Sequence, residues 1–147
     1  MALLSKALRA DPDFETEVCV TAQHRTMLDQ VLSIFDLQPR FDLDLMKANQ
    51  GLAEITARIV TGMTEVLREF RPDWLLVQGD TTTAMVAALA AFYEKVSIGH
   101  VEAGLRTGFK YSPWPEEMNR AIVGRLADLH LAPTPRARDA LLREGVP

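Results

Sequence analysis

Two kinds of apolar spacing alternate along this 147-residue chain, and the alternation limits the folds that it can adopt. Short continuous apolar runs are typical of buried strands, whereas apolar residues that recur every three or four positions indicate one face of a helix. The short runs predict strands at 17–21, 74–77, 96–101 and 129–132, and the longer spacing predicts helices at 2–9, 27–35, 52–70, 84–92, 116–126 and 134–143. Because strands that alternate with helices are joined by right-handed crossovers, the sequence predicts an α/β fold: a Rossmann-like parallel sheet with helices on both faces.

The two ends of the chain bear on its domain organisation. A fold of this type usually opens on a central strand, but this chain opens on the predicted helix at 2–9 and stops where another strand is due. Residues 39–49 are polar and irregular and are predicted to form a loop. We therefore expect residues 1–147 to form a single, incomplete N-terminal Rossmann-like domain that lacks its first strand.

Composition excludes some classes of partner. Sixteen basic and 20 acidic residues give a formal net charge of −4, which argues against nucleic acid as the main partner. No apolar stretch reaches the roughly 18 residues that span a bilayer. The single cysteine, Cys19, lies in an apolar run, which indicates a buried, inert thiol rather than a reactive one. These features favour a reduced, cytoplasmic protein.

Three unusual segments follow predicted strands, and ligands of open α/β sheets bind beyond the carboxyl ends of the strands. In the first, at residues 78–83, Gly79 allows close approach of the backbone and Asp80 stands at the tip of the strand. The threonines that follow can cap the next helix, whose N-terminus is suited to anions. Asp80 is therefore either a functional carboxylate or only a helix cap.

The second segment, residues 99–108, carries His100, Glu102 and Arg106 among three glycines. A glutamate just past a buried strand is expected to have poor access to water, which favours general acid or base catalysis. The alternatives are that Glu102 pairs with Arg106 in a loop, and that His100 is a structural histidine.

The third segment, residues 111–120, has Pro115 at the expected first turn of a helix, followed by Glu116 and Glu117. Acidic residues at a helix start are also favoured by the helix dipole alone, so a catalytic glutamate is one of two interpretations. Arg120 is spaced to pair with either glutamate.

These segments together carry a family resemblance. The strings GHVEAGLRTG and YSPWPEEMNR, with VQGDTTT upstream and VCVTAQHRTMLDQVL near the start, closely resemble non-hydrolysing UDP-N-acetylglucosamine 2-epimerases along almost the whole chain. The resemblance implies one half of a two-domain, glycosyltransferase-B-like fold with the active site between the domains. It implies that UDP-N-acetylglucosamine and UDP-N-acetylmannosamine are interconverted by elimination and re-addition of UDP, without metal or nicotinamide, to supply bacterial surface polysaccharide.

The resemblance also assigns roles to residues. Asp80, Glu102 and Glu116 are expected to move a proton at C2 and to support positive charge at the anomeric carbon. Arg106 is expected to orient the substrate, and the matched motifs make three further residues candidates for substrate binding, namely His100, Glu117 and Arg120. The segment TAQHR resembles part of an effector site for the substrate, which points to Gln23 and Gln50.

The sequence departs from the family at its ends. The opening strand with its loop, and a C-terminal domain with a catalytic histidine and most of the nucleotide contacts, have no counterpart. We therefore expect the chain alone to be inactive and the full-length protein to be a homodimer that binds neither nucleic acid nor membrane. The alternative is a non-catalytic remnant, or an α/β module that only binds sugar nucleotide.

Overall fold

The computed structural model describes residues 1–21, 25–45 and 50–146. Backbone contacts divide the chain into two compact units, Met1–Gly51 and Leu52–Pro147. Each unit consists of parallel strands and helices, so the predicted α/β class is confirmed. Among the described residues, no helix is long and apolar enough to cross a membrane.

The first unit contains two helices and two short parallel strands. The elements are α1 (Ala2–Ala10), β1 (Cys19–Val20), α2 (Arg25–Ile34) and β2 (Phe41–Asp42). Cys19 pairs with Phe41 and Val20 with Asp42. The predicted strand at 17–21 is thus shorter, and the loop predicted for 39–49 is wrong at Phe41–Asp42. Cys19 is half-buried rather than buried as predicted. Desolvation, with a smaller contribution from the charge of Asp42, still raises the pKa of its thiol to about 11, as expected of an inert thiol.

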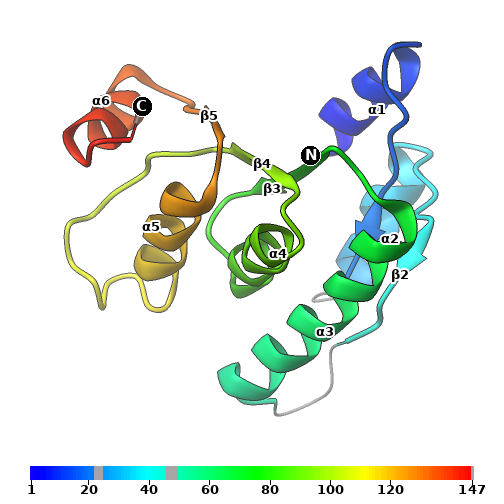
Figure 1. The fold of residues 1–147 in the computed structure, drawn as a ribbon, viewed down its shortest axis with the longest axis horizontal. Coiled ribbons are helices and arrows are strands. Elements are labelled where there is room, and N and C mark those ends of the chain that lie inside the picture. The colour runs from blue at the N-terminus through cyan, green and yellow to red at the C-terminus, as the bar shows by residue number, and fades with distance from the viewer. Residues whose placement is uncertain (22–24, 46–49, 147) are drawn as a thin grey trace. The chain divides into compact units, whose positions relative to one another are not determined.

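The second unit contains the remaining elements and all three segments singled out in the sequence (Figure 1). In chain order the elements are α3 (Leu52–Phe70), β3 (Trp74–Gln78), α4 (Thr82–Tyr93), β4 (Ser97–Val101), α5 (Glu116–Leu126), β5 (Leu129–Leu131) and α6 (Pro135–Arg143). The predicted helices at 52–70 and 116–126 are confirmed without change, and the other predicted elements of this unit shift by at most two residues at either end.

The sheet of this unit is parallel, with strand order β3-β4-β5. Gln78 pairs with Val101, and Val101 pairs with Leu131, so the three strands end at the same level. The segments that follow β3, β4 and β5 therefore meet at one edge of the sheet, which we call the carboxyl edge. The predicted strand at 74–77 was expected to be covered on both faces, but Trp74 is 49% exposed, so this expectation is wrong at the start of β3.

Helix α4 forms the centre of the second unit and contacts both α3 and α5 (Figure 1). Alanine dominates its buried positions, and the small side chains let the neighbouring helices approach closely. Ala88, Ala90 and Ala91 are fully buried, as the sequence predicts for this helix, although Phe92 near its C-terminus is 57% exposed.

Candidate functional site

The three predicted catalytic carboxylates come from three neighbouring segments. Asp80 lies in the turn after β3, Glu102 immediately follows β4, and Glu116 is the first residue of α5. Because β3 and β4 are adjacent and parallel, Asp80 and Glu102 lie at the same carboxyl edge. The contacts described below connect α5 to this edge.

The turn after β3 is shaped by Gly79. This residue has φ +73°, in the left-handed region that glycine adopts readily, and its N–H donates to Val101 O at 3.0 Å. The helix cap is Thr81, whose Oγ1 accepts from Ala84 N at 3.2 Å. The prediction that the threonines cap α4 is confirmed, and the interpretation of Asp80 as the cap is wrong.

Asp80 is held by α5 through two side chains. Arg120 Nη2 lies 2.7 Å from Asp80 Oδ2, and Asn119 Nδ2 donates to the backbone oxygen of Asp80 at 2.9 Å. Asn119 and Arg120 are both buried. The orientation of Asp80 is therefore set by α5 as well as by its own turn.

Arg120 also contacts both glutamates of the third segment, in different ways. Its Nη1 lies 3.5 Å from Glu117 Oε2, while its Nε donates to the backbone oxygen of Glu116 at 3.3 Å. Glu117 is therefore its ion-pair partner within α5. The half-buried Glu116 follows Pro115, which is the N-cap residue rather than part of the first turn as predicted.

Glu117 is 5% exposed and binds the loop after β4. Its Oε1 accepts from Thr107 N at 3.0 Å and from Gly108 N at 2.9 Å. Burial alone raises the pKa of Glu117, but the amides of Gly108 and Thr107 and the charge of Arg120 outweigh it, so the pKa is lowered. Glu117 is thus a buried anion that anchors the loop after β4, and its expected role in substrate binding stays a prediction.

Glu102 lies at the carboxyl edge with its side chain exposed. Its backbone has φ +64°, which is uncommon for a residue with a Cβ. Gln78 Nε2 donates to Glu102 Oε2 at 3.3 Å. The expectation that Glu102 is shielded from water is wrong, because the residue falls just beyond the end of β4, and so is the expected pairing with Arg106.

Arg106 pairs instead with Glu144 at the end of α6. Its Nε and Nη2 donate to the two carboxylate oxygens at 2.8 Å each, and its side chain is 13% exposed. Glycine at position 124 of α5 leaves room for it, since a Cβ there would lie 3.1 Å from Nη2. This arrangement fastens α6 to the loop after β4, and the expectation that Arg106 orients the substrate stays a prediction.

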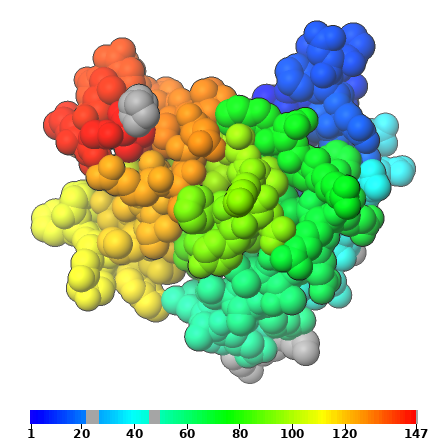
Figure 2. All heavy atoms as spheres, in the orientation of Figure 1, coloured from blue at the N-terminus to red at the C-terminus, as the bar shows by residue number. Residues whose placement is uncertain are grey.

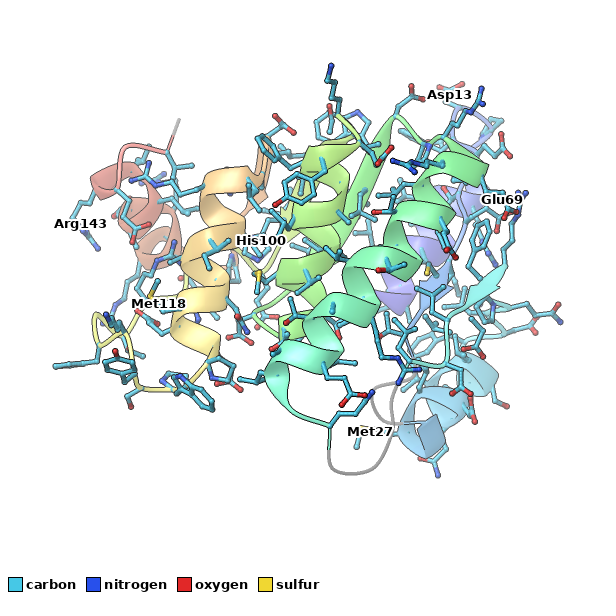
Figure 3. The ribbon with its side chains drawn as sticks, turned by 60° about the horizontal axis from the view of Figure 1, so that its bottom comes forward. Asp13, Met27, Glu69, His100, Met118 and Arg143 are labelled. Atoms are coloured by element: carbon cyan, nitrogen blue, oxygen red, sulfur yellow. The ribbon has the colours of Figure 1, made fainter. Side chains whose placement is uncertain are left out.

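His100 is fully buried in β4, between the packed elements of the second unit (Figure 3). Its Nε2 donates to Gly79 O at 2.8 Å, so the ring supports the turn that carries Asp80. Desolvation lowers the pKa of His100, despite the hydrogen bond to Gly79. The neutral, enclosed ring fits the structural interpretation of this histidine better than substrate binding.

A shallow pocket of about 880 Å³ opens next to Glu102. It lies between the ends of β3, β4 and β5 and the start of α6, and its lining carries one carboxylate, one histidine and one arginine: Glu102, His130 and Arg138. Within the described parts of the chain, no group of three or more His, Cys, Asp or Glu residues is arranged to hold a metal ion. The pocket offers space for an organic ligand at the carboxyl edge.

The loop that precedes α5 projects from the surface of the second unit (yellow in Figure 2). Two of its aromatic side chains, Phe109 and Tyr111, are each 72% exposed. The loop is fixed at Thr107 and Gly108, whose amides donate to Glu117, and the exposed aromatic residues follow these two residues in the chain.

Sequence reasoning missed three residues that the structure brings into this site, namely Gln78, Asn119 and Glu144. Asn119 precedes Arg120 in the chain, but its burial and its bond to Asp80 are visible only in the structure. Nothing local marked Glu144, which meets Arg106 only through tertiary packing.

The two predicted effector residues are only partly described. Gln23 lies outside the described residues. Gln50 is half-buried, and its Nε2 donates to Leu45 O at 3.1 Å. The effector role of both residues stays a prediction.

The chain is similar to known proteins along almost its whole length. The model of the UDP-N-acetylglucosamine 2-epimerase family matches residues 6–147. The UDP-N-acetylglucosamine 2-epimerases of Yersinia pestis and Escherichia coli K12 are 60% and 58% identical, over 100% and 99% of this chain and 39% of their own lengths. The chain thus spans about two fifths of the curated relatives that it matches.

Solved structures extend the likeness to three dimensions. UDP-GlcNAc 2-epimerase from Neisseria meningitidis, bound to UDP-GlcNAc, is 51% identical, with a TM-score of 0.97 over 100% of this chain and 40% of that one. The Methanocaldococcus jannaschii enzyme, in complex with UDP-GlcNAc and UDP, is 30% identical, with a TM-score of 0.91 over 99% of this chain and 40% of that one.

Proposed function

The chain belongs to the UDP-N-acetylglucosamine 2-epimerase family, and from this premise we propose that its carboxyl edge serves the interconversion of UDP-N-acetylglucosamine and UDP-N-acetylmannosamine. The observation that carries the proposal is the placement of Asp80, Glu102 and Glu116. These residues follow β3, follow β4 and open α5, and lie in the part of the chain that the family model matches. The product would supply bacterial surface polysaccharide.

The proposed chemistry is an elimination followed by an addition. A proton leaves C2, the bond between C1 and the UDP oxygen breaks with its electron pair going to UDP, and a C1–C2 double bond forms. Addition of UDP with a proton delivered to the opposite face of C2 gives the epimer. Carboxylates suit both demands of this reaction, because they transfer protons and stabilise the positive charge that develops at C1.

We place the sugar nucleotide in the pocket beside Glu102. Glu102 is exposed at the pocket wall, where a ligand can reach it, and Arg138 supplies a cation to the same wall. Asp80 is held in one orientation by Arg120, as preorganised catalytic groups are. We further propose that the protein acts in the cytoplasm as a homodimer, without a metal or nicotinamide.

The proposal is tested by placing this chain in the context of a whole relative. In a hybrid, the 147 residues of this chain replace the matching stretch of the Yersinia pestis enzyme, to which they are 60% identical. We expect the purified hybrid to convert UDP-N-acetylglucosamine into UDP-N-acetylmannosamine, measured by proton NMR of the sugar nucleotides. A folded hybrid that binds UDP-N-acetylglucosamine but forms no product would contradict the epimerase proposal and favour a module that only binds.

A further inference from the structure

The buried carboxylate of Glu117 has a different environment from the three proposed catalytic carboxylates. It is 5% exposed, and both of its oxygens are engaged. Thr107 N lies 3.0 Å from Oε1 and 3.1 Å from Oε2, and Gly108 N lies 2.9 Å from Oε1. The pocket lining includes Glu102 but not Asp80, Glu116 or Glu117, so burial and hydrogen bonding, rather than the pocket, distinguish Glu117.

The guanidinium of Arg120 connects Glu117 to Asp80 at the carboxyl edge. Arg120 is 9% exposed, and it forms ion pairs with Glu117 through Nη1 and with Asp80 through Nη2. Its third donor, Nε, is engaged by the backbone oxygen of Glu116. Because the guanidinium is planar and rigid, fixing one of its nitrogens fixes the direction in which the others point.

The charges in this group are unequal, since two carboxylates share one cation. Arg120 is closer to Asp80, at 2.7 Å, than to Glu117, at 3.5 Å. Removing the charge of Glu117 leaves Arg120 with Asp80 as its one ion-pair partner among the described residues, and frees Nη1 from its anchor. Both changes act on the Asp80 carboxylate, although Glu117 does not touch it.

We propose that Glu117 is a positioning residue for the epimerisation: it sets the orientation of Arg120, and through Arg120 that of Asp80, without contacting the substrate. The proposal rests on the function proposed above. It replaces the sequence-based expectation that Glu117 binds substrate, and it gives Arg120 the role of connecting the two carboxylates. The same carboxylate anchors the loop after β4, so one residue couples that loop to Asp80.

The first test is a double-mutant cycle in the hybrid enzyme. Glu117→Gln keeps the shape of the side chain and is expected to lower kcat about 10- to 100-fold, on the scale of a displaced catalytic group, with KM changed by less than about 3-fold. In the Asp80→Asn background the same change is expected to lower kcat by less than about 3-fold, because residues that act through each other are not additive. Glu65→Gln, on the exposed side of α3, is the matched control and is expected to leave kcat unchanged in both backgrounds.

Two outcomes of the cycle, and one of a separate Arg120 variant, overturn the proposal. An equal loss of kcat in both backgrounds would make Glu117 independent of Asp80. A rise in KM with unchanged kcat would place Glu117 in contact with the substrate. Retained activity in Arg120→Lys, which keeps the charge but cannot bridge two carboxylates in one plane, would remove Arg120 as the connection.

The second test needs no activity and uses the 147-residue chain itself. The carboxyl carbon of Asp80 and the Nε of Arg120 are followed by NMR in labelled protein at pH 7. Glu117→Gln is expected to shift both resonances, whereas Glu65→Gln is not. Unchanged resonances in folded Glu117→Gln would overturn the positioning role even if the hybrid is active, and an inactive hybrid with shifted resonances would contradict the proposed function alone.

Discussion

Arg120 Nη2 lies 2.7 Å from Asp80 Oδ2, and this ion pair joins α5 to the turn after β3. Both residues belong to motifs that the sequence analysis treated separately. Their contact gives the carboxyl edge a fixed geometry, because Asn119 on the same helix also binds the backbone of Asp80 at 2.9 Å. The position of a proposed catalytic carboxylate thus depends on a helix from another part of the chain.

The first prediction concerns the three proposed catalytic carboxylates. Asp80→Asn, Glu102→Gln and Glu116→Gln are each expected to lower kcat of the hybrid enzyme about 100-fold or more, which is the usual scale of acid–base contributions. Steady-state rates of UDP-N-acetylmannosamine formation provide the measurement, with Glu65→Gln as control. Near-normal turnover of any one variant would remove that residue from the set.

The second prediction concerns two glycines of the loop after β4 that share a left-handed backbone. Gly104 has φ +87° and Gly108 has φ +81°, but a Cβ at Gly104 would overlap the backbone oxygen of Ala137, whereas nothing lies within 4 Å of a Cβ at Gly108. Gly108→Ala is expected to cost about 1 kcal/mol of unfolding free energy from backbone strain alone. Gly104→Ala is expected to cost about 3 kcal/mol or more, because steric overlap adds to that strain.

Urea titrations of the 147-residue chain, followed by circular dichroism, measure both glycine variants. Gly108→Ala serves as the matched control, since it imposes the same backbone strain without the overlap. Equal losses of unfolding free energy in the two variants would show that overlap with Ala137 adds nothing to the cost of a Cβ at position 104.

The third prediction concerns pH. Burial lowers the pKa of His100 in the folded chain below the ordinary histidine value of 6.5. As the pH falls through 6.5, this histidine therefore takes up a proton more readily in the unfolded chain than in the folded one. The stability that the neutral ring contributes is fully present above pH 6.5 and is lost as the pH falls. We expect the urea midpoint to drop between pH 7.5 and pH 5.5, and to drop less in His100→Gln. The same drop in both proteins would show that His100 does not titrate on unfolding in this range.

Local signals predicted much of the fold. Helix α5 begins and ends where the sequence predicts, because Pro115 and two acidic residues mark its start within a few positions. Strand β2 was missed because it has only two residues and is defined by pairing with β1, which lies far away in the sequence. Propensity carries no information about such a pairing.

The chemistry of the site was predicted less completely than its location. The sequence predicts that Asp80 and Glu102 lie at one edge, since parallel strands end together, whereas Glu116 opens α5, which the structure connects to that edge through Arg120. The spacing of residues did not predict which side chains form hydrogen bonds with each other. Glu102 and Arg106 are four residues apart, yet Arg106 binds Glu144 and Glu102 binds Gln78. Partner choice depends on the packing of α6 and on the backbone turn at Glu102, and neither is encoded by spacing.

The central claim is that the carboxylates of this chain remove and return a proton at C2 of the sugar nucleotide. The most direct measurement is to incubate the hybrid enzyme with UDP-N-acetylglucosamine in heavy water and to follow C2 by proton NMR and mass spectrometry. We predict one deuterium at C2 of UDP-N-acetylmannosamine and, as the reaction reverses, of UDP-N-acetylglucosamine, and no incorporation in Asp80→Asn, Glu102→Gln or Glu116→Gln within the time that the unchanged hybrid needs for equilibrium. Epimerisation that leaves the C2 hydrogen of both sugar nucleotides unexchanged would contradict the account.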